Sequence, residues 1–421
     1  MTRRSVEVLA DWAGLGGAHL MGGLHADKAK AKEVMSFEYD KTWLKDHAQV
    51  LDPRLTLYAG PQFPPESHQT FGIFKDSAPG KFGRALMRRR EAQGARAEGR
   101  AERILTDFDY LLGVHDIQRL GALRFRFSAE HPFLDDNDEN AAPPLARLRE
   151  IEAASLELER EGVEEDAAYA RLLALLAPGS SLGGARPKAG VVDTDGSLWI
   201  AKFPSRTDEY DVGAWEAVTH ELARRAGVDV APARSMQLGA HTTFLTRRFD
   251  RRPTGERLHF GSSMTLLDRV DGDDASTGAS YLELAEFLAR AGTAHVKSDL
   301  EQLWRRIVFF MCVSNVDDHL RNHGFLLDPA AGGWRLAPAY DMNPVATADG
   351  LKLNVSDNDN SQDLELARSV IDFFRISSSR AAAIIDEVLG AVRVWREVAG
   401  ALGVTRGDQA RMARAFLLAA G

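Results

Sequence analysis

The chain has 421 residues, of which 44% are hydrophobic and 8% aromatic, and its formal net charge is −9. This length exceeds one ordinary core and predicts two or three packed units, and the composition excludes wholesale disorder. The negative charge argues against a broad nucleic-acid-binding surface. The single cysteine, Cys312, excludes an internal disulfide and a multi-cysteine zinc site, and its apolar surroundings predict a buried, inert thiol.

The chain lacks the features of a membrane or exported protein. No run of about 18 apolar residues occurs, and the N-terminus has no apolar stretch long enough for a signal peptide. We therefore expect a cytoplasmic protein with no membrane partner.

The first part of the chain, residues 1–134, predicts a small mixed α/β domain. Short apolar runs alternate with glycine and turn residues up to Leu55–Tyr58, which we expect to be the last of several short strands. Helices are expected over Thr70–Arg90 and Arg103–Leu112.

Two polar segments interrupt this pattern. Arg88–Arg96 is rich in arginine and small residues, and it predicts a mobile surface loop, with a contact for an acidic partner or a phosphate as the alternative. Asp135–Asn140 concentrates like charge and is followed by Pro143 and Pro144, which predicts a linker and a domain boundary.

After the linker, the pattern predicts a β-rich half (145–250) and a helical half (251–421). The first contains, in order, helix Leu145–Ala177, a hairpin of Ala189–Val192 and Leu198–Phe203, helix Trp215–Ala226 and strands within Gln237–Phe249. In the second, apolar residues recurring every three or four positions predict helices over 281–291, 299–313, 365–376, 380–399 and 407–419. The fold class predicted from this order is α+β with two lobes.

Two features of the β-rich half suit a nucleotide. Ser180–Lys188 is a small-residue loop, and glycines such as Gly183 and Gly184 let backbone N–H groups approach phosphate oxygens, although such a loop alone is weak evidence. Lys202 lies in an apolar strand, where a buried ammonium needs a partner. Glu216 on the following helix would supply it, as in kinases; a solvent-exposed lysine is the alternative.

The helical half carries two acidic motifs. Asp317 and Asn322 have the spacing of a kinase catalytic loop, in which the aspartate accepts the proton of the attacking hydroxyl and the asparagine holds a metal ion. Asp341 follows 19 residues later, at about the interval of the second metal-binding carboxylate, and Mg²⁺ prefers such oxygen ligands. His319, inside the first motif, predicts either a phosphate contact or a structural hydrogen bond. Zinc-protease and Walker phosphate-loop motifs do not occur.

Residues Asn315–Phe325 and Leu336–Pro344 together resemble the signature of the HipA family of serine/threonine kinases, the toxins of bacterial toxin–antitoxin pairs. The likeness extends to Ser181–Lys188, to Arg247–Arg251 and to the N-terminal segment Phe71–Pro79. It implies a protein-kinase-like fold with a β-rich N-lobe, a helical C-lobe and a small mixed N-terminal domain.

The resemblance also implies roles for individual residues. Asp317 would be the catalytic base, and Asn322 and Asp341 would complete the catalytic set and bind Mg²⁺. The residues implied to bind ATP are Gly183, Gly184, Ala185, Arg186, Lys188, Lys202, Glu216, Arg247, Phe249, His319 and Tyr340. Autophosphorylation would fall on Ser181, with Ser180 as the neighbouring candidate, and added negative charge there would weaken ATP binding.

The same likeness implies partners. Known substrates of the family include aminoacyl-tRNA synthetases, and DNA binding belongs chiefly to a HipB-like antitoxin, so contact with DNA would be indirect. Two other functions stay open: a kinase for a small-molecule hydroxyl, and a catalytically inactive co-repressor. Asn315 stands where small-molecule kinases usually carry histidine, which disfavours the first. The intact Lys202, Asp317, Asn322 and Asp341 argue against the second.

Overall fold

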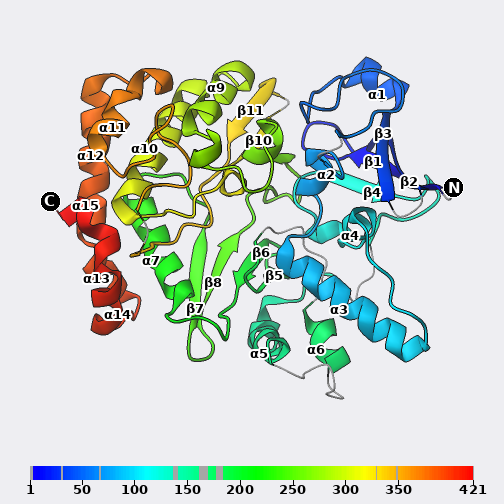
Figure 1. Ribbon diagram of the computed structural model, residues 1–421, viewed down its shortest axis with the longest axis horizontal. Helices are drawn as coiled ribbons and strands as arrows, with labels where there is room; N and C mark the ends of the chain where they lie inside the picture. The colour runs from blue at the N-terminus through cyan, green and yellow to red at the C-terminus, as the bar shows by residue number, and fades with distance from the viewer. Residues whose placement is uncertain are drawn as a thin grey trace. The chain divides into compact units, whose positions relative to one another are not determined.

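The structure is a computed structural model that describes residues 3–29, 32–65, 68–135, 141–160, 169–176, 184–328, 330–347 and 349–420. The chain forms two compact units (Figure 1). The first comprises Met1–Arg206 with Asp250–Gly261, and the second comprises Thr207–Phe249 with Ser262–Gly421. Sheets and helices occur in both, which confirms the predicted α+β class. The three domain ranges expected from the sequence remain a prediction.

An antiparallel sheet organises the N-terminal part of the first unit. Its strand order is β3-β2-β1-β4, with β1 Arg3–Ala10, β2 His19–Ala29, β3 Lys32–Tyr39 and β4 Leu123–Arg126. Val8 lies opposite Phe125 and both are fully buried. The strand predicted at Leu55–Tyr58 is wrong, because the Gln62 side-chain amide bonds both the N–H and the carbonyl of Thr56, at 2.8 Å each, in place of a partner strand.

The helices of the first unit include a segment that was expected to be a loop. They are α1 Lys41–Asp46, α2 Gly72–Asp76, α3 Lys81–Glu98, α4 Asp107–Leu112, α5 Leu148–Leu158 and α6 Tyr169–Leu175. The loop predicted at Arg88–Arg96 is wrong, since these residues belong to α3. Arg89 donates to the carbonyl of Leu158 at 2.7 Å and Arg90 to that of Leu173 at 2.9 Å. The arginines therefore satisfy carbonyls near the C-terminal ends of α5 and α6.

The first unit also contains the hairpin predicted after the linker. Strands β5 (Lys188–Val192) and β6 (Leu198–Lys202) pair antiparallel, which confirms the prediction. Gly196 closes the turn with φ +80° and donates its N–H to the carbonyl of Asp193 at 2.9 Å. Only a residue that tolerates the left-handed region fits there.

A segment from later in the chain, Asp250–Gly261, packs into this first unit. The Asp250 carboxylate accepts the N–H of Gly121 at 2.8 Å, and the Arg251 guanidinium donates to the carbonyls of Gly121 and Arg119 at 3.1 and 2.8 Å. The buried His259 ring lies against Trp12, with centroids 5.4 Å apart. Residues about 130 to 250 positions apart in sequence are thus brought together in the first unit.

In the second unit, helix α7 (Val212–Arg225) packs on the hairpin of β7 (Ala233–Gln237) and β8 (Thr242–Arg247). Asp211 caps α7 through the N–H of Ala214 and also accepts the N–H of Thr242. A Cβ at Gly213 would lie 2.0 Å from the Thr242 carbonyl oxygen, so only glycine allows this close approach. Gly227 follows the helix with φ +71°, the left-handed conformation in which many helices end.

The rest of the second unit is mainly helical (Figure 1). Its elements are β9 Phe260–Ser262 (which begins in the first unit), α8 Ser263–Leu266, α9 Tyr281–Ala291, α10 Val296–Val313, the paired β10 Gly324–Asp328 and β11 Gly333–Leu336, α11 Leu364–Ser369, α12 Ser378–Arg393, α13 Trp395–Ala401, α14 Arg406–Met412 and α15 Leu417–Ala420. Helix α10 is the core, in contact with α9, α11, α12 and α15. Burial raises the pKa of Cys312 in α10 to about 12, in agreement with the expected inert thiol. No helix among the described residues is long and apolar enough to cross a bilayer.

Candidate active site

The predicted catalytic loop begins where the core helix α10 ends. Ser314 closes the helix in the left-handed conformation, with φ +48°, and Asn315 donates its N–H to the carbonyl of Phe310 at 3.0 Å. Asp317 follows on a turn with an exposed side chain, whereas its neighbour Asp318 is fully buried. The carboxylate predicted as base is therefore exposed to solvent, whereas the end of α10 before it and Asp318 after it are buried.

Asn322, the predicted amide ligand, is fixed directly to the predicted base. Its side-chain nitrogen donates to the backbone carbonyl of Asp317 at 3.1 Å, and the residue is buried. Since the nitrogen is used in this bond, the amide oxygen is the atom left to serve as a metal ligand. The structure thus brings these two residues together.

The segment that carries Asp341 lies alongside the catalytic loop. The Asn343 N–H donates to the side-chain oxygen of Asn315 at 2.9 Å, and the Val345 N–H donates to the carbonyl of Ser314 at 3.0 Å. Asp341 itself is half-buried and has a left-handed backbone with φ +59°. Such a conformation is uncommon for a residue other than glycine and is concentrated at functional sites.

A buried polar network beneath the loop was not predicted from the sequence. The Asp318 carboxylate accepts the hydroxyl of Tyr281 at 2.7 Å and lies 2.6 Å from Nε2 of His323. Burial raises the pKa of Tyr281 far above its ordinary value, and the Asp318 carboxylate adds to this shift. Arg306, also fully buried, donates to the Ala337 carbonyl at 2.8 Å, and burial lowers the pKa of its guanidinium. The network joins the residue after the base to the residue after Asn322.

Tyr340 lies beside Phe249, another of the predicted nucleotide-binding residues. Its ring is 5.6 Å from that of Phe249, tilted by 35°, and its hydroxyl donates to the Arg321 carbonyl at 2.8 Å. Arg247, at the end of β8, donates its N–H to the carbonyl of Pro232. The structure therefore places Phe249 beside the residue that precedes Asp341.

His319 sits inside the catalytic loop. Its N–H donates to the Asp317 carbonyl, and its own carbonyl accepts the N–H of Asn322 at 2.8 Å. Among the described residues its Nδ1 atom has no hydrogen-bond partner although it is buried. The backbone of His319 thus shapes the loop, and a phosphate contact by its ring stays a prediction.

The cationic residues predicted to bind phosphate belong to the first unit. Lys188 and Lys202 are directly opposite each other on β5 and β6, and Lys202 is only 8% exposed, which removes the solvent-exposed alternative. A Cβ at Gly184, whose φ is +86°, would lie 2.8 Å from the Lys188 ammonium. The ammonium therefore folds back onto the glycine loop. Ala185 and Arg186 lie in the bend between them.

Some predicted site residues are not joined to this set. Glu216 is buried on α7 in the second unit, and its pairing with Lys202 stays a prediction. Gly183, Ser180 and Ser181 lie outside the described residues. Among the residues described, no cluster of three His, Cys, Asp or Glu side chains could hold a metal ion.

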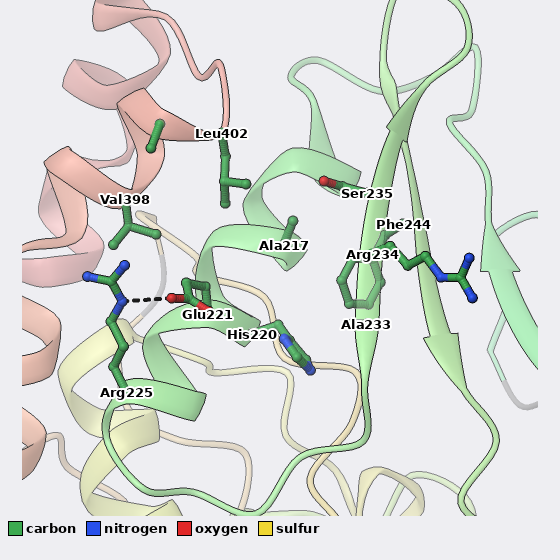
Figure 2. Close-up of a pocket in the computed structure, with 11 residues that line it drawn as sticks. Ala217, His220, Glu221, Arg225, Ala233, Arg234, Ser235, Phe244, Val398 and Leu402 are labelled. Carbon is green, nitrogen blue, oxygen red and sulfur yellow. Dashed lines mark hydrogen bonds and ion pairs between the residues drawn. The ribbon is translucent and has the colours of Figure 1, made fainter. Parts of the chain in front are cut away.

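The second unit also has a groove of about 280 Å³ that the sequence did not predict (Figure 2). Helix α7 contributes Ala217, His220 and Glu221, strand β8 contributes Phe244, and Leu402 follows α13. None of the residues predicted for catalysis or nucleotide binding lines it. This groove is therefore separate from the candidate active site.

The chain has a kinase-like α+β fold, and the segment that carries Asp341 is bonded to the predicted catalytic loop. The sequence matches the HipA-like C-terminal domain over residues 180–395, and the chain belongs to that family. The resemblance seen in the sequence motifs is thereby confirmed.

Known proteins resemble the chain to different extents. The chain of HipA from Shewanella oneidensis, solved in a complex with HipB and operator DNA, superposes over 98% of this chain and 95% of its own, with a TM-score of 0.63 and 15% identity. The two proteins therefore share a fold. A Haemophilus influenzae protein described as a kinase candidate is 26% identical over 186 residues, which are 40% of this chain and 53% of that protein. The Helicobacter pylori kinase CtkA matches 57% of this chain and 93% of its own, with 14% identity and a TM-score of only 0.39.

Proposed function

We propose that this protein is a Mg²⁺- and ATP-dependent protein kinase that transfers the γ-phosphoryl group of ATP to a serine or threonine hydroxyl. The observation that carries the proposal is that hydrogen bonds connect the segments of Asp317, Asn322 and Asp341 within the second unit. Asn322 bonds the backbone of Asp317, and the Asp341 segment is bonded to the start of the same loop. A base and two oxygen ligands on adjacent segments are what phosphoryl transfer requires.

Asp317 is suited to the role of base. Its carboxylate is exposed, so a hydroxyl on the surface of another protein can reach it, and accepting the proton makes that hydroxyl a better nucleophile. Asn322 and Asp341 offer one amide oxygen and one carboxylate, a donor set that fits Mg²⁺ when phosphate oxygens complete the shell. When bound, the metal would neutralise charge on the phosphates.

The lysine pair supports the binding of ATP phosphates. Residues directly opposite in an antiparallel pair have Cβ atoms about 5 Å apart, and like charges there are destabilising. Lys188 and Lys202 occupy such a pair, next to the backbone of Gly184. The two ammonium groups would complement the negative charge of a bound phosphate. A triphosphate at a glycine loop is the natural anion for such a site.

Family membership supports a wider role as a growth-arresting toxin. The Shewanella HipA was solved with HipB and operator DNA, and we infer a HipB-like antitoxin for this chain, with DNA bound only through that partner. Aminoacyl-tRNA synthetases are the substrate class that the sequence resemblance implies. Autophosphorylation of Ser181 or Ser180 would add charge beside the phosphate loop and weaken ATP binding.

The test is transfer from γ-labelled ATP by the full-length protein to a bacterial lysate, with Asp317→Asn as the informative variant. Loss of the base should lower transfer by about 10²- to 10⁴-fold. ATP binding should persist, because the carbonyl of residue 317 that Asn322 uses is unchanged. Asp349→Asn, at an exposed carboxylate of the same unit, is the matched control and should keep full activity.

The outcomes separate the proposal from its alternatives. Label on proteins at serine or threonine supports it, and label only on small molecules would replace it with a metabolite kinase. No transfer by the wild type, despite bound ATP, would favour the inactive co-repressor. Normal turnover of Asp317→Asn would remove the assignment of the base.

A further inference from the structure

Asn315 links the two segments on which the proposed function rests. It lies two residues before the predicted base, and its side-chain oxygen accepts the N–H of Asn343, two residues after Asp341, at 2.9 Å. The residue is 1% exposed. One hydrogen bond therefore connects the predicted base segment to the predicted metal-binding segment.

The acceptor of this bond is held rigidly. Asn315 donates its own N–H to the carbonyl of Phe310, in the last turn of the buried helix α10, and Ser314 before it closes that helix. The backbone of Asn315 is therefore held in place by the core helix. Because its side-chain oxygen accepts the Asn343 N–H, this bond also restrains the backbone of Asn343.

The backbone that donates this bond lies two residues from a strained residue. Asp341 has φ +59°, a conformation that persists in residues other than glycine only when neighbouring contacts determine it. On the N-terminal side of Asp341, the Tyr340 hydroxyl donates to the carbonyl of Arg321, and the Ala339 N–H donates to the carbonyl of Asp229. On the following side, the side-chain oxygen of Asn315 accepts the N–H of Asn343. This bond is placed to keep the Asp341 carboxylate in its half-buried position.

The pattern of bonds indicates an acceptor role rather than a general packing role. A buried amide normally uses both its oxygen and its nitrogen. Among the described residues, the Asn315 nitrogen has no hydrogen-bond partner although it is buried, so only the oxygen is engaged. A side chain that keeps the oxygen and loses the NH₂ group should therefore keep the function.

We propose that Asn315 is a positioning residue that holds Asp341 in place for a divalent metal through its bond to the backbone of Asn343. This rests on the proposed function, in which Asp341 is a metal ligand. Residues that orient metal ligands change metal affinity by about 10- to 100-fold when they are lost. The effect should appear in metal binding and not merely in stability.

The test measures the binding of a non-hydrolysable ATP analogue to the full-length protein, with and without Mg²⁺. Asn315→Leu keeps the volume and removes the acceptor, and it should reduce the Mg²⁺-dependent gain in affinity by about ten-fold or more. Asn315→Ser keeps a neutral oxygen acceptor without adding a charge, and it should retain more of the Mg²⁺ dependence than the leucine variant. Gln409→Leu is the matched control, since Gln409 is also buried and donates to one backbone carbonyl, that of Val404. It should leave metal dependence unchanged.

Two results would overturn the inference. One is a folded Asn315→Leu protein with the wild-type Mg²⁺ dependence; the other is a folded Asn315→Ser protein that loses as much as the leucine variant. If Asn315→Leu does not fold, Asn315→Ala provides the same comparison. A wild type that binds the analogue without any response to Mg²⁺ would instead refute the proposed function, and the inference would fall with it.

Discussion

Acid should weaken the first unit through His259, and replacing this residue should remove the effect. Burial lowers the pKa of His259 to about 3, against an ordinary value of 6.5. The ring lies against Trp12 and is 2% exposed, so protonation in the folded state would place a cation in an apolar cluster. His259→Phe keeps an aromatic ring there and cannot be protonated.

Proton linkage gives the sign and the size of the change in the free energy of unfolding. Between about pH 6.5 and pH 3 the unfolded chain binds a proton at this position and the folded chain does not, so the free energy of unfolding falls as the pH falls. From about pH 7 to pH 5 the loss attributable to His259 is about 2 kcal/mol. Above about pH 7 this contribution is fully present and constant.

The assay is denaturant unfolding of the wild type and of His259→Phe at several pH values in this range. Other groups also titrate, so the quantity to compare is the difference between the two proteins, which should change by about 2 kcal/mol over the two pH units. His295→Gln, at an exposed histidine, should follow the wild type. Identical pH dependence of the wild type and His259→Phe would refute the reasoning.

Two further substitutions test other parts of the structure. Tyr281→Phe removes one of the hydrogen bonds to the buried Asp318 carboxylate and should lower the free energy of unfolding by about 2 kcal/mol, measured by denaturant titration; an unchanged midpoint would contradict the bond. Gly213→Ala places a Cβ against the Thr242 carbonyl and should destabilise the second unit by about 1–3 kcal/mol, measured by thermal unfolding, and a stability equal to the wild type would show that α7 can move away from β8.

Local sequence signals predicted the helices and strands whose ends are marked by residues close by in the chain. The helix 281–291 was located correctly because its apolar residues recur every three or four positions, and the structure adds a bond from the Ser280 N–H to Glu283 at its start. The hairpin before Lys202 was found because a turn sequence separates two apolar runs. These features depend on residues close together in the chain, which is what a sequence pattern records.

Elements that depend on distant partners were missed. Arg88–Arg96 has the composition of a loop, but Arg89 and Arg90 bond carbonyls about 70 to 80 positions away, which no local pattern reveals. Leu55–Tyr58 has the composition of a strand, but Gln62 occupies the backbone bonds of Thr56. In both places tertiary contacts override local propensity.

The sequence predicted the residues of the candidate site but not the buried residues that hold them in place. The spacing of Asp317 and Asn322 was visible in the sequence, and the structure adds the bond between them. The roles of Asn315 and Asp318 required knowledge of which chain segments meet. A buried acidic side chain next to an exposed one, as in the Asp317–Asp318 pair, leaves no distinguishing sign in a single sequence.

The return of Asp250–Gly261 to the first unit limits how the protein can be divided by genetic means. A fragment that begins after the linker would retain Arg251 and His259 and lose Gly121 and Trp12, the groups against which they are buried. The boundary of the matched family region, at residue 180, is therefore a poor place to truncate the gene. Such a fragment would expose an ion pair and an aromatic face together, and we expect it to aggregate.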